Sequence, residues 1–231
     1  KYIAEPFLGL SQGLGAVLIV TVFVQIFWFF GIHGPNVLAP VLEGIWGQAQ
    51  LINIDIFQKG YEGKTGTAAV LAAIDDGKAY MWVRGSFDAF AWFGGSGGTI
   101  VLIIAILLFS KRADYLTVGK LSLGPGIFNI NEPIMFGLPV VLNPIMFIPF
   151  VIAPLVATTI GWVATYLGLV APVSQQVAWV TPPLLLSFLA TGADWRAPIV
   201  ALVCMVVTFL IWTPFVIAAN KMDPALGESE Q

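Results

Sequence analysis

Residues 123–144 read Leu-Gly-Pro-Gly-Ile-Phe-Asn-Ile-Asn-Glu-Pro-Ile-Met-Phe-Gly-Leu-Pro-Val-Val-Leu-Asn-Pro. At the centre of this stretch, Glu132 is the only Asp, Glu, Lys, Arg or His between Lys120 and Asp194. A charged side chain in the middle of a bilayer costs about 3 kcal/mol or more, so such residues usually face a cavity or a partner. The surrounding Gly, Pro and Asn residues interrupt helices, and at membrane depth such backbone is tolerated only where it is buried in protein or lines a cavity. We therefore predict a polar site inside a membrane protein rather than a solvated loop.

The composition of the whole chain also indicates a membrane protein. Of the 231 residues, 58% are hydrophobic and only 10% are charged, whereas soluble domains carry about 25% charged residues. The net charge is −3 and the basic residues are scattered, so no nucleic-acid partner is expected. One His and one Cys cannot form a closed metal site, so we expect no metal and no cofactor. Cys204 lies in an apolar run and is interpreted as a small buried side chain.

Stretches without charged residues predict where the chain crosses the bilayer. A helical span needs about 20 apolar residues, and residues 7–32, 89–110, 133–193 and 197–220 meet that requirement. The third stretch is long enough for two spans and a re-entrant piece, or for three short spans, and its prolines predict kinked or interrupted helices. Segments 34–57 and 119–137 mix apolar residues with Gly, Pro and Asn, which suits hairpins that enter the membrane without crossing it. The expected fold is an all-α integral membrane protein with about five transmembrane helices and two re-entrant hairpins.

Two polar segments are expected outside the bilayer. Residues 59–88 form the most polar part of the chain, with a short amphipathic helix predicted near residues 67–74. Lys111, Arg112 and Lys120 cluster in a later connection, which the positive-inside rule places in the cytoplasm. The chain begins with neither an initiator Met nor a signal peptide, so we expect it to be part of a longer protein.

His33, the only histidine, has the same kind of surroundings as Glu132. It lies where an aromatic-rich apolar stretch ends against Gly34, Pro35 and Asn36. Taken by itself, this position would also fit a histidine that faces water at the membrane surface. Two polar helix breaks that meet near the middle of the membrane, however, are how many transporters build a substrate site. We therefore expect His33 and Glu132 to share one site.

The residues available in these segments favour a sugar as the solute. They contain no Arg or Lys, which argues against a carboxylate or phosphate substrate. Amides and carboxylates bind sugar hydroxyls, and aromatic faces suit the apolar face of a pyranose. The predicted contacts are therefore His33, Glu132, Asn36, Asn129 and Asn131, with Trp28 and Trp179 stacking on the sugar.

Three motifs resemble those of one family. Phe128-Asn129-Ile130-Asn131-Glu132-Pro133-Ile134-Met135-Phe136-Gly137-Leu138-Pro139, with Asn143-Pro144, is similar to the signature of the enzyme IIC membrane component of bacterial phosphotransferase systems, in the lactose/cellobiose/diacetylchitobiose branch. Trp28-Phe29-Phe30-Gly31-Ile32-His33-Gly34 and the run from Phe87-Asp88-Ala89-Phe90 to Gly94-Gly95-Ser96-Gly97 resemble two further signatures. The resemblance extends over nearly the whole chain in the same order.

The resemblance implies that residues 1–231 are the C-terminal, substrate-binding half of a disaccharide permease of the bacterial inner membrane. The family's N-terminal half, through which it forms a homodimer, is not in this sequence. The donor of the phosphoryl group would be a phosphocysteine of the partner IIB, itself charged through IIA, and not a residue of this chain. By resemblance, His33 and Glu132 hold the hydroxyl that is phosphorylated, Glu132 acts as its base, and Gly34 and Asp88 join the substrate-binding residues.

Two other classes of function fit some of the same residues. An ion-coupled secondary sugar transporter would use Glu132 and His33 as a proton relay. An intramembrane hydrolase would need a nucleophile and a base, for which Ser96 and His33 are the candidate pair. Formation of phosphorylated sugar distinguishes the phosphotransferase reading from both.

Overall fold

The computed structural model describes residues 8–138 and 140–221, which contain helices and no β-strand. The helices are α2 (Leu14–Phe29), α3 (Gly34–Val37), α4 (Ala39–Val41), the π-helix η1 (Leu42–Gly47), α5 (Gln48–Lys59), α6 (Gly66–Asp75), α7 (Arg84–Phe90), α8 (Thr99–Phe109), α9 (Ala113–Ile127), α10 (Glu132–Gly137), α11 (Pro144–Tyr166), α12 (Pro183–Ala190) and α13 (Arg196–Ala219). The predicted all-α class is confirmed, and α6 confirms the helix predicted near residues 67–74.

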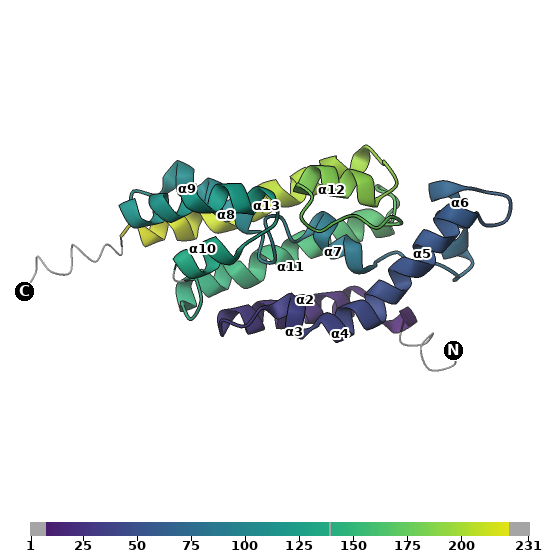
Figure 1. Ribbon diagram of the computed structural model, residues 1–231, viewed down its shortest axis with the longest axis horizontal. Coiled ribbons are helices and arrows are strands. Elements are labelled where there is room, and N and C mark those ends of the chain that lie inside the picture. The colour runs from purple at the N-terminus through teal and green to yellow at the C-terminus, as the bar shows by residue number, and fades with distance from the viewer. Residues whose placement is uncertain (1–7, 139, 222–231) are drawn as a thin grey trace, which may run out of the picture.

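Figure 1 shows an elongated bundle in which α11 occupies the middle. On one side of α11 lies α13, which packs along both α11 and α8, while α8 packs on α9. On the other side, α2 packs against α11. Helices α5 and α6 pack on each other at one end of the bundle. Among the short elements, α7 packs against α11, α13 and η1, α12 packs against α13 and α7, and α10 packs against α9.

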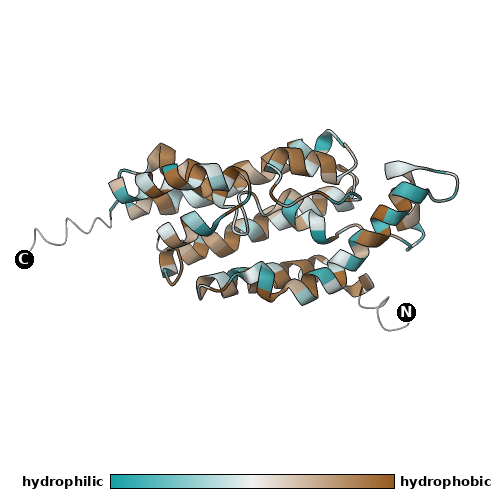
Figure 2. Cartoon of the chain, in the orientation of Figure 1, coloured by the Kyte–Doolittle hydropathy of each residue, from teal (hydrophilic) through white to brown (hydrophobic). Residues whose placement is uncertain are grey.

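Among the described residues, two helices, Ile145–Tyr166 and Arg196–Ala219, are long and apolar enough to cross a membrane, while α2 and α8 are shorter apolar helices. Apolar side chains of α13 point outward: Ile199, Leu202, Val206 and Leu210 are each between 49% and 62% exposed. Figure 2 shows this apolar character along α11 and α13, whereas α5 carries hydrophilic residues along its length. An exposed apolar surface on a span-length helix is what a lipid-facing surface requires.

The structure differs from the expectation for stretches 89–110 and 133–193. Within the first of these stretches, α7 ends at Phe90, residues 91–98 form glycine-rich turns, and helix resumes only over Thr99–Phe109. Gly94, Gly95 and Gly97 have φ of +73°, +98° and +101°, a conformation that L side chains rarely adopt. Stretch 133–193 contains one span-length helix, α11, which continues through Pro149 and Pro154. The short helix α12 follows it. No helix covers residues 167–182, and α12 begins at the predicted Pro182-Pro183 break.

The two predicted hairpins have different outcomes in the fold. Residues 119–137 do fold back, because the end of α9 and α10 pack together around a turn at residues 128–131. Residues 34–57 form the successive helices α3, α4, η1 and α5 instead of a hairpin. Pro35 and Pro40 each lie in the first turn of a short helix, where a missing N–H costs little, so they begin helices rather than end them. Whether either segment enters the membrane without crossing it stays a prediction.

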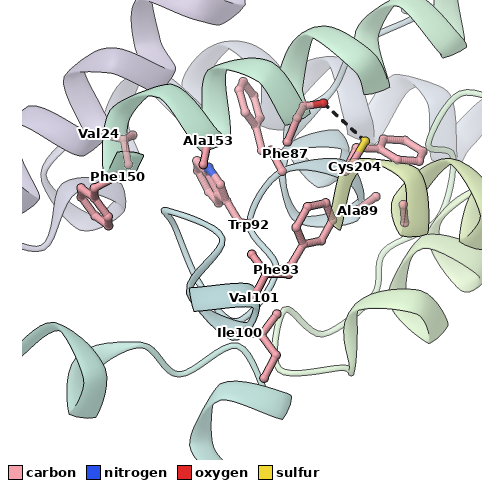
Figure 3. Packing of buried hydrophobic residues seen from close by; sticks show 14 of the residues in the cluster. Val24, Phe87, Ala89, Trp92, Phe93, Ile100, Val101, Phe150, Ala153 and Cys204 are labelled. Carbon is pink, nitrogen blue, oxygen red and sulfur yellow. Dashed lines mark hydrogen bonds between the residues drawn. The ribbon is translucent and has the colours of Figure 1, made fainter. Parts of the chain in front are cut away.

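An aromatic core holds α7 between the long helices. Phe87 makes edge-on contacts with Trp46 and Trp82, at ring-centroid distances of 5.7 and 5.5 Å, and stacks on Trp92 at 5.3 Å. Figure 3 shows this region, together with the contact from the buried Cys204 Sγ to the Ala157 carbonyl oxygen at 3.6 Å. Cys204 is 0% exposed, as predicted for a small buried side chain. The packing fixes α7 and the glycine turns that follow it, which form part of the site described next.

Candidate functional site

A cavity of about 290 Å³ lies where the two predicted helix breaks meet. We name it the His33–Glu132 cavity. Among the predicted site residues, its wall contains His33, Asn36, Asp88, Asn129, Asn131, Glu132 and Trp179. It also contains Arg84, Trp92 and Ser96. The structure therefore brings most of the predicted residues to one cavity, from segments far apart in the sequence.

His33 and Glu132 face each other across this cavity. The His33 Nε2 to Glu132 Oε1 distance is 3.7 Å, too long for a direct hydrogen bond. His33 also caps α3, because its Nδ1 accepts the backbone N–H of Asn36 at 3.3 Å. A neutral imidazole has one donor and one acceptor nitrogen, so this cap assigns the proton to Nε2. A donor on His33 and an acceptor on Glu132 thus converge on the same point of the cavity.

Trp28 and Gly34 lie behind His33 rather than in the cavity wall. The Trp28 ring is 1% exposed and its centroid lies 4.7 Å from that of His33. Gly34 packs directly on the backbone of Val24, where an added Cβ would collide with the Val24 carbonyl. These two residues set the position of His33 against α2. The expected stacking of Trp28 on a sugar stays a prediction, although the structure places its ring against His33.

Asn129 and Asn131 tie the cavity walls together through their side-chain amides. Asn129 adopts φ +62°. Its Oδ1 accepts the Gly94 N–H at 2.8 Å, and its Nδ2 donates to the carbonyl oxygens of Trp179 at 2.6 Å and of Thr181 at 2.8 Å. Nδ2 of Asn131 donates to the carbonyl oxygen of the cavity-lining Ser96 at 3.0 Å. The turn at residues 128–131 is therefore hydrogen-bonded both to the glycine turns at residues 91–98 and to the loop that carries Trp179.

The structure adds Arg84, which sequence reasoning missed. Its Nη1 lies 2.8 Å from Asp88 Oδ2, and its Nε lies 3.0 Å from Glu43 Oε1. Its guanidinium also lies 4.9 Å from the centroid of the Trp92 ring. The expectation that the site segments hold no Arg is thus corrected, because α7 brings one into the wall. The available signal was the spacing of Arg84 four residues before Asp88, which puts both side chains on one face of a helix.

Trp179 is the most accessible aromatic residue of the cavity wall. It lies in the non-helical segment before α12 and is 55% exposed. Its backbone carbonyl accepts a hydrogen bond from Asn129 while more than half of the residue stays exposed. A fixed backbone with an accessible ring is suited to contact with a ligand.

Comparisons with known proteins agree with this architecture. Residues 3–154 match the protein-family model described as "Phosphotransferase system, EIIC". The chain is 59% identical over 228 residues to the PTS system cellobiose-specific EIIC component of Lactococcus lactis subsp. lactis (strain IL1403), covering 96% of this chain and 46% of that protein. It is 36% identical over 230 residues to the PTS system oligo-beta-mannoside-specific EIIC component of Bacillus subtilis (strain 168), covering 99% of this chain and 48% of that protein.

A solved structure is also similar. The crystal structure of the transporter ChbC, the IIC component from the N,N'-diacetylchitobiose-specific phosphotransferase system, superposes with a TM-score of 0.87 at 33% identity. The match covers 99% of this chain and 50% of that one. The chain spans about half the length of the curated relatives it matches.

Proposed function

Because this chain belongs to the EIIC family of the phosphotransferase system, we propose that it is the sugar-binding part of a membrane permease for a disaccharide of the cellobiose, lactose or chitobiose type. The sugar bound in the His33–Glu132 cavity is phosphorylated by phospho-IIB as it reaches the cytoplasm. The observation that carries this proposal is the convergence of His33 Nε2 and Glu132 Oε1, 3.7 Å apart, on one point of the cavity. The names of the relatives, which specify cellobiose, oligo-β-mannosides and lactose, support a saccharide substrate.

The proposed chemistry places one sugar hydroxyl between the two side chains. The Nε2–H of His33 donates to the hydroxyl oxygen and orients it, while the carboxylate of Glu132 accepts the hydroxyl proton. The hydroxyl oxygen then forms a bond to phosphorus as the sulfur–phosphorus bond of the IIB phosphocysteine breaks. The phosphoryl group moves from sulfur to sugar, and the proton ends on Glu132. The chain itself supplies binding, orientation and a base.

The partners and the location follow from the same proposal. IIB docks from the cytoplasmic side. Lys111 and Arg112 lie in the connection between α8 and α9, and Lys120, predicted in the same connection, lies within α9. By the positive-inside rule these three cations favour a cytoplasmic position for this connection. IIA acts indirectly by recharging IIB. Some relatives are named EIICB components, and these names, which join IIC and IIB, support IIB as the partner. The membrane is the bacterial inner membrane, and homodimer formation is assigned to the family's N-terminal half.

The hydrolase reading is the weaker alternative because His33 has no nitrogen free to act as a base toward Ser96. Its Nδ1 already accepts the Asn36 N–H, and its Nε2 faces Glu132. The ion-coupled reading uses the same two side chains and differs in its product. Phosphotransferase uptake delivers a phosphorylated sugar, and its rate does not fall in the short term when a protonophore is added.

The first experiment is a thermal-shift screen of the purified protein against cellobiose, lactose, chitobiose and simple hexoses. We expect stabilisation by at least one disaccharide, because a ligand that binds only the folded state raises the unfolding temperature. Addition of phospho-IIB should then convert that disaccharide to its phosphate. Release of unmodified sugar, with uptake abolished by a protonophore, would favour the ion-coupled alternative.

A further inference from the structure

A second cavity of about 300 Å³ adjoins the His33–Glu132 cavity. Arg84, Asp88 and Trp179 line both cavities, so the two cavities meet at these side chains. We name the second space the glutamine cavity, because four Gln side chains line it: Gln48, Gln50, Gln175 and Gln176. No role described so far uses this space.

The lining of the glutamine cavity is suited to a neutral, hydroxyl-rich ligand. Gln48 and Gln176 are exposed side chains, and an amide can both donate to and accept from a hydroxyl. The one cation of the wall, Arg84, is paired with Asp88 at 2.8 Å and with Glu43 at 3.0 Å, so it does not offer a free charge to an anion. Trp179, 55% exposed, contributes an aromatic surface to the same wall.

The floor of the glutamine cavity is rigid, as a binding site requires. Gln50 is 4% exposed, and its Oε1 accepts the Gly85 N–H at 2.6 Å. Its Nε2 donates to the Gln175 carbonyl oxygen at 3.2 Å and to Gln176 Oε1 at 3.3 Å. This one amide therefore links α5, α7 and the loop before α12. The Nε2 atom of Gln175 is buried without a hydrogen-bond partner among the described residues.

We propose that the glutamine cavity is a distal saccharide subsite, which binds a third sugar unit of a β-linked oligosaccharide whose reacting end lies between His33 and Glu132. The proposal rests on the proposed function, since it assumes a saccharide in the His33–Glu132 cavity. Each cavity is near the lower limit of about 300–1,000 Å³ for small-molecule sites, so a ligand longer than a disaccharide uses both. Arg84, Asp88 and Trp179 then contact the chain where it passes from one cavity to the other.

The test compares binding of glucose, cellobiose and cellotriose to the purified chain by isothermal titration calorimetry. Wild type is expected to bind cellotriose more tightly than cellobiose. Two variants confined to the glutamine cavity, Gln48→Ala and Leu51→Trp, should remove that gain and leave cellobiose affinity unchanged. The expected loss for cellotriose is about two- to tenfold, the range for one neutral hydrogen bond. Gln58→Ala is the matched control, because Gln58 is exposed on the same helix α5 and lies outside both cavities.

Two outcomes would overturn the inference, and they differ from failure of the proposed function. Equal affinity of wild type for cellobiose and cellotriose would show that no third unit is bound. Equal losses for both sugars in Gln48→Ala and Leu51→Trp would show that the glutamine cavity has no separate role. If wild type bound none of the three sugars, the proposed function for these sugars would fail as well.

Discussion

Trp28 packs against His33 with ring centroids 4.7 Å apart and an angle of 51° between the ring planes. The imidazole is thereby held from behind by a side chain that is 1% exposed, while its Nε2 points to Glu132 across the cavity. Trp28 and the Asn36 N–H thus set the position and tautomer of His33, and its Nε2 lies 3.7 Å from Glu132 Oε1.

Glu132→Gln should reduce phosphoryl transfer more than sugar binding. The amide keeps the volume and one acceptor oxygen but cannot accept the hydroxyl proton. Calorimetry of disaccharide binding, set beside the rate of sugar-phosphate formation with phospho-IIB, measures the two effects separately. A variant that transfers at the wild-type rate would exclude Glu132 as the base.

His33→Ala should weaken disaccharide binding by about two- to tenfold, because a hydrogen bond between neutral groups contributes about 0.5–1.5 kcal/mol. The Ala variant also removes the cap of α3. His33→Asn is the control, because Asn is a good N-cap but is too short to replace Nε2. Both variants should bind sugar poorly, and only His33→Ala should unfold at a lower temperature. Full binding by His33→Asn would count against a direct contact with sugar.

The two candidate tryptophans should behave differently on truncation. Trp179→Ala should weaken sugar binding with little change in unfolding temperature, because the ring is 55% exposed. Trp28→Ala should lower stability by about 3–5 kcal/mol, as expected for a buried aromatic residue. It should also weaken binding through displacement of His33, whereas Trp28→Phe retains a ring behind His33 and should lose less. Unchanged affinity in both Ala variants would exclude stacking on the sugar.

Asn129→Ala should destabilise the site by removing three hydrogen bonds that join the glycine turn to the loop carrying Trp179. Asn129→Gly separates backbone strain from hydrogen bonding, since Gly accepts φ +62° without cost while Ala does not. We expect wild type to have the highest unfolding temperature, Asn129→Gly a lower one and Asn129→Ala the lowest. Wild-type stability of the Gly variant would show that the hydrogen bonds contribute nothing.

Asp194→Asn should lower stability in a pH-dependent way. Asp194 lies in the connection between α12 and α13, where its Oδ2 accepts the Ala171 N–H at 2.8 Å and pairs with Arg196 Nη2 at 2.8 Å. Burial alone would raise the pKa of Asp194, but hydrogen bonds from the Arg196 side chain and from the Ala171 and Arg196 N–H groups outweigh it, so the pKa lies below its usual value. A carboxylate with a lowered pKa stabilises the fold above its unfolded pKa of about 3.9, and this contribution is lost as the pH falls below that value.

The difference in unfolding temperature between wild type and Asp194→Asn should therefore be largest at neutral pH and shrink on acidification below about pH 4. Asp55→Asn is the control, because Asp55 makes an exposed ion pair with Lys59, with the two side chains 57% and 74% exposed. A difference for Asp194→Asn that stays constant across this pH range would contradict the assignment.

Local features of the sequence were enough to predict the fold class and a polar cavity at Glu132, the centre of the candidate site. Apolar length predicts a membrane helix because a bilayer has a fixed thickness, and α13 follows that rule closely. An isolated carboxylate among Gly, Pro and Asn predicts a polar cavity because burial of an unpaired charge is costly, and Glu132 lies in such a cavity. Both inferences depend on properties of one segment, and neither needs a partner element to be known.

The remaining features depend on which surfaces of the helices meet, and only the tertiary structure decides them. Arg84 joins the cavity wall because the core around Phe87 holds α7 there, and Trp28 lies behind His33 because Gly34 allows α3 to pack against α2. The side-chain amide of Asn129 is hydrogen-bonded to Gly94 and to Trp179, which are distant from it in sequence. No local sequence pattern around Asn129 predicts these partners. Residue type and spacing predict which groups can do chemistry, whereas packing between distant helices determines which of them share a cavity.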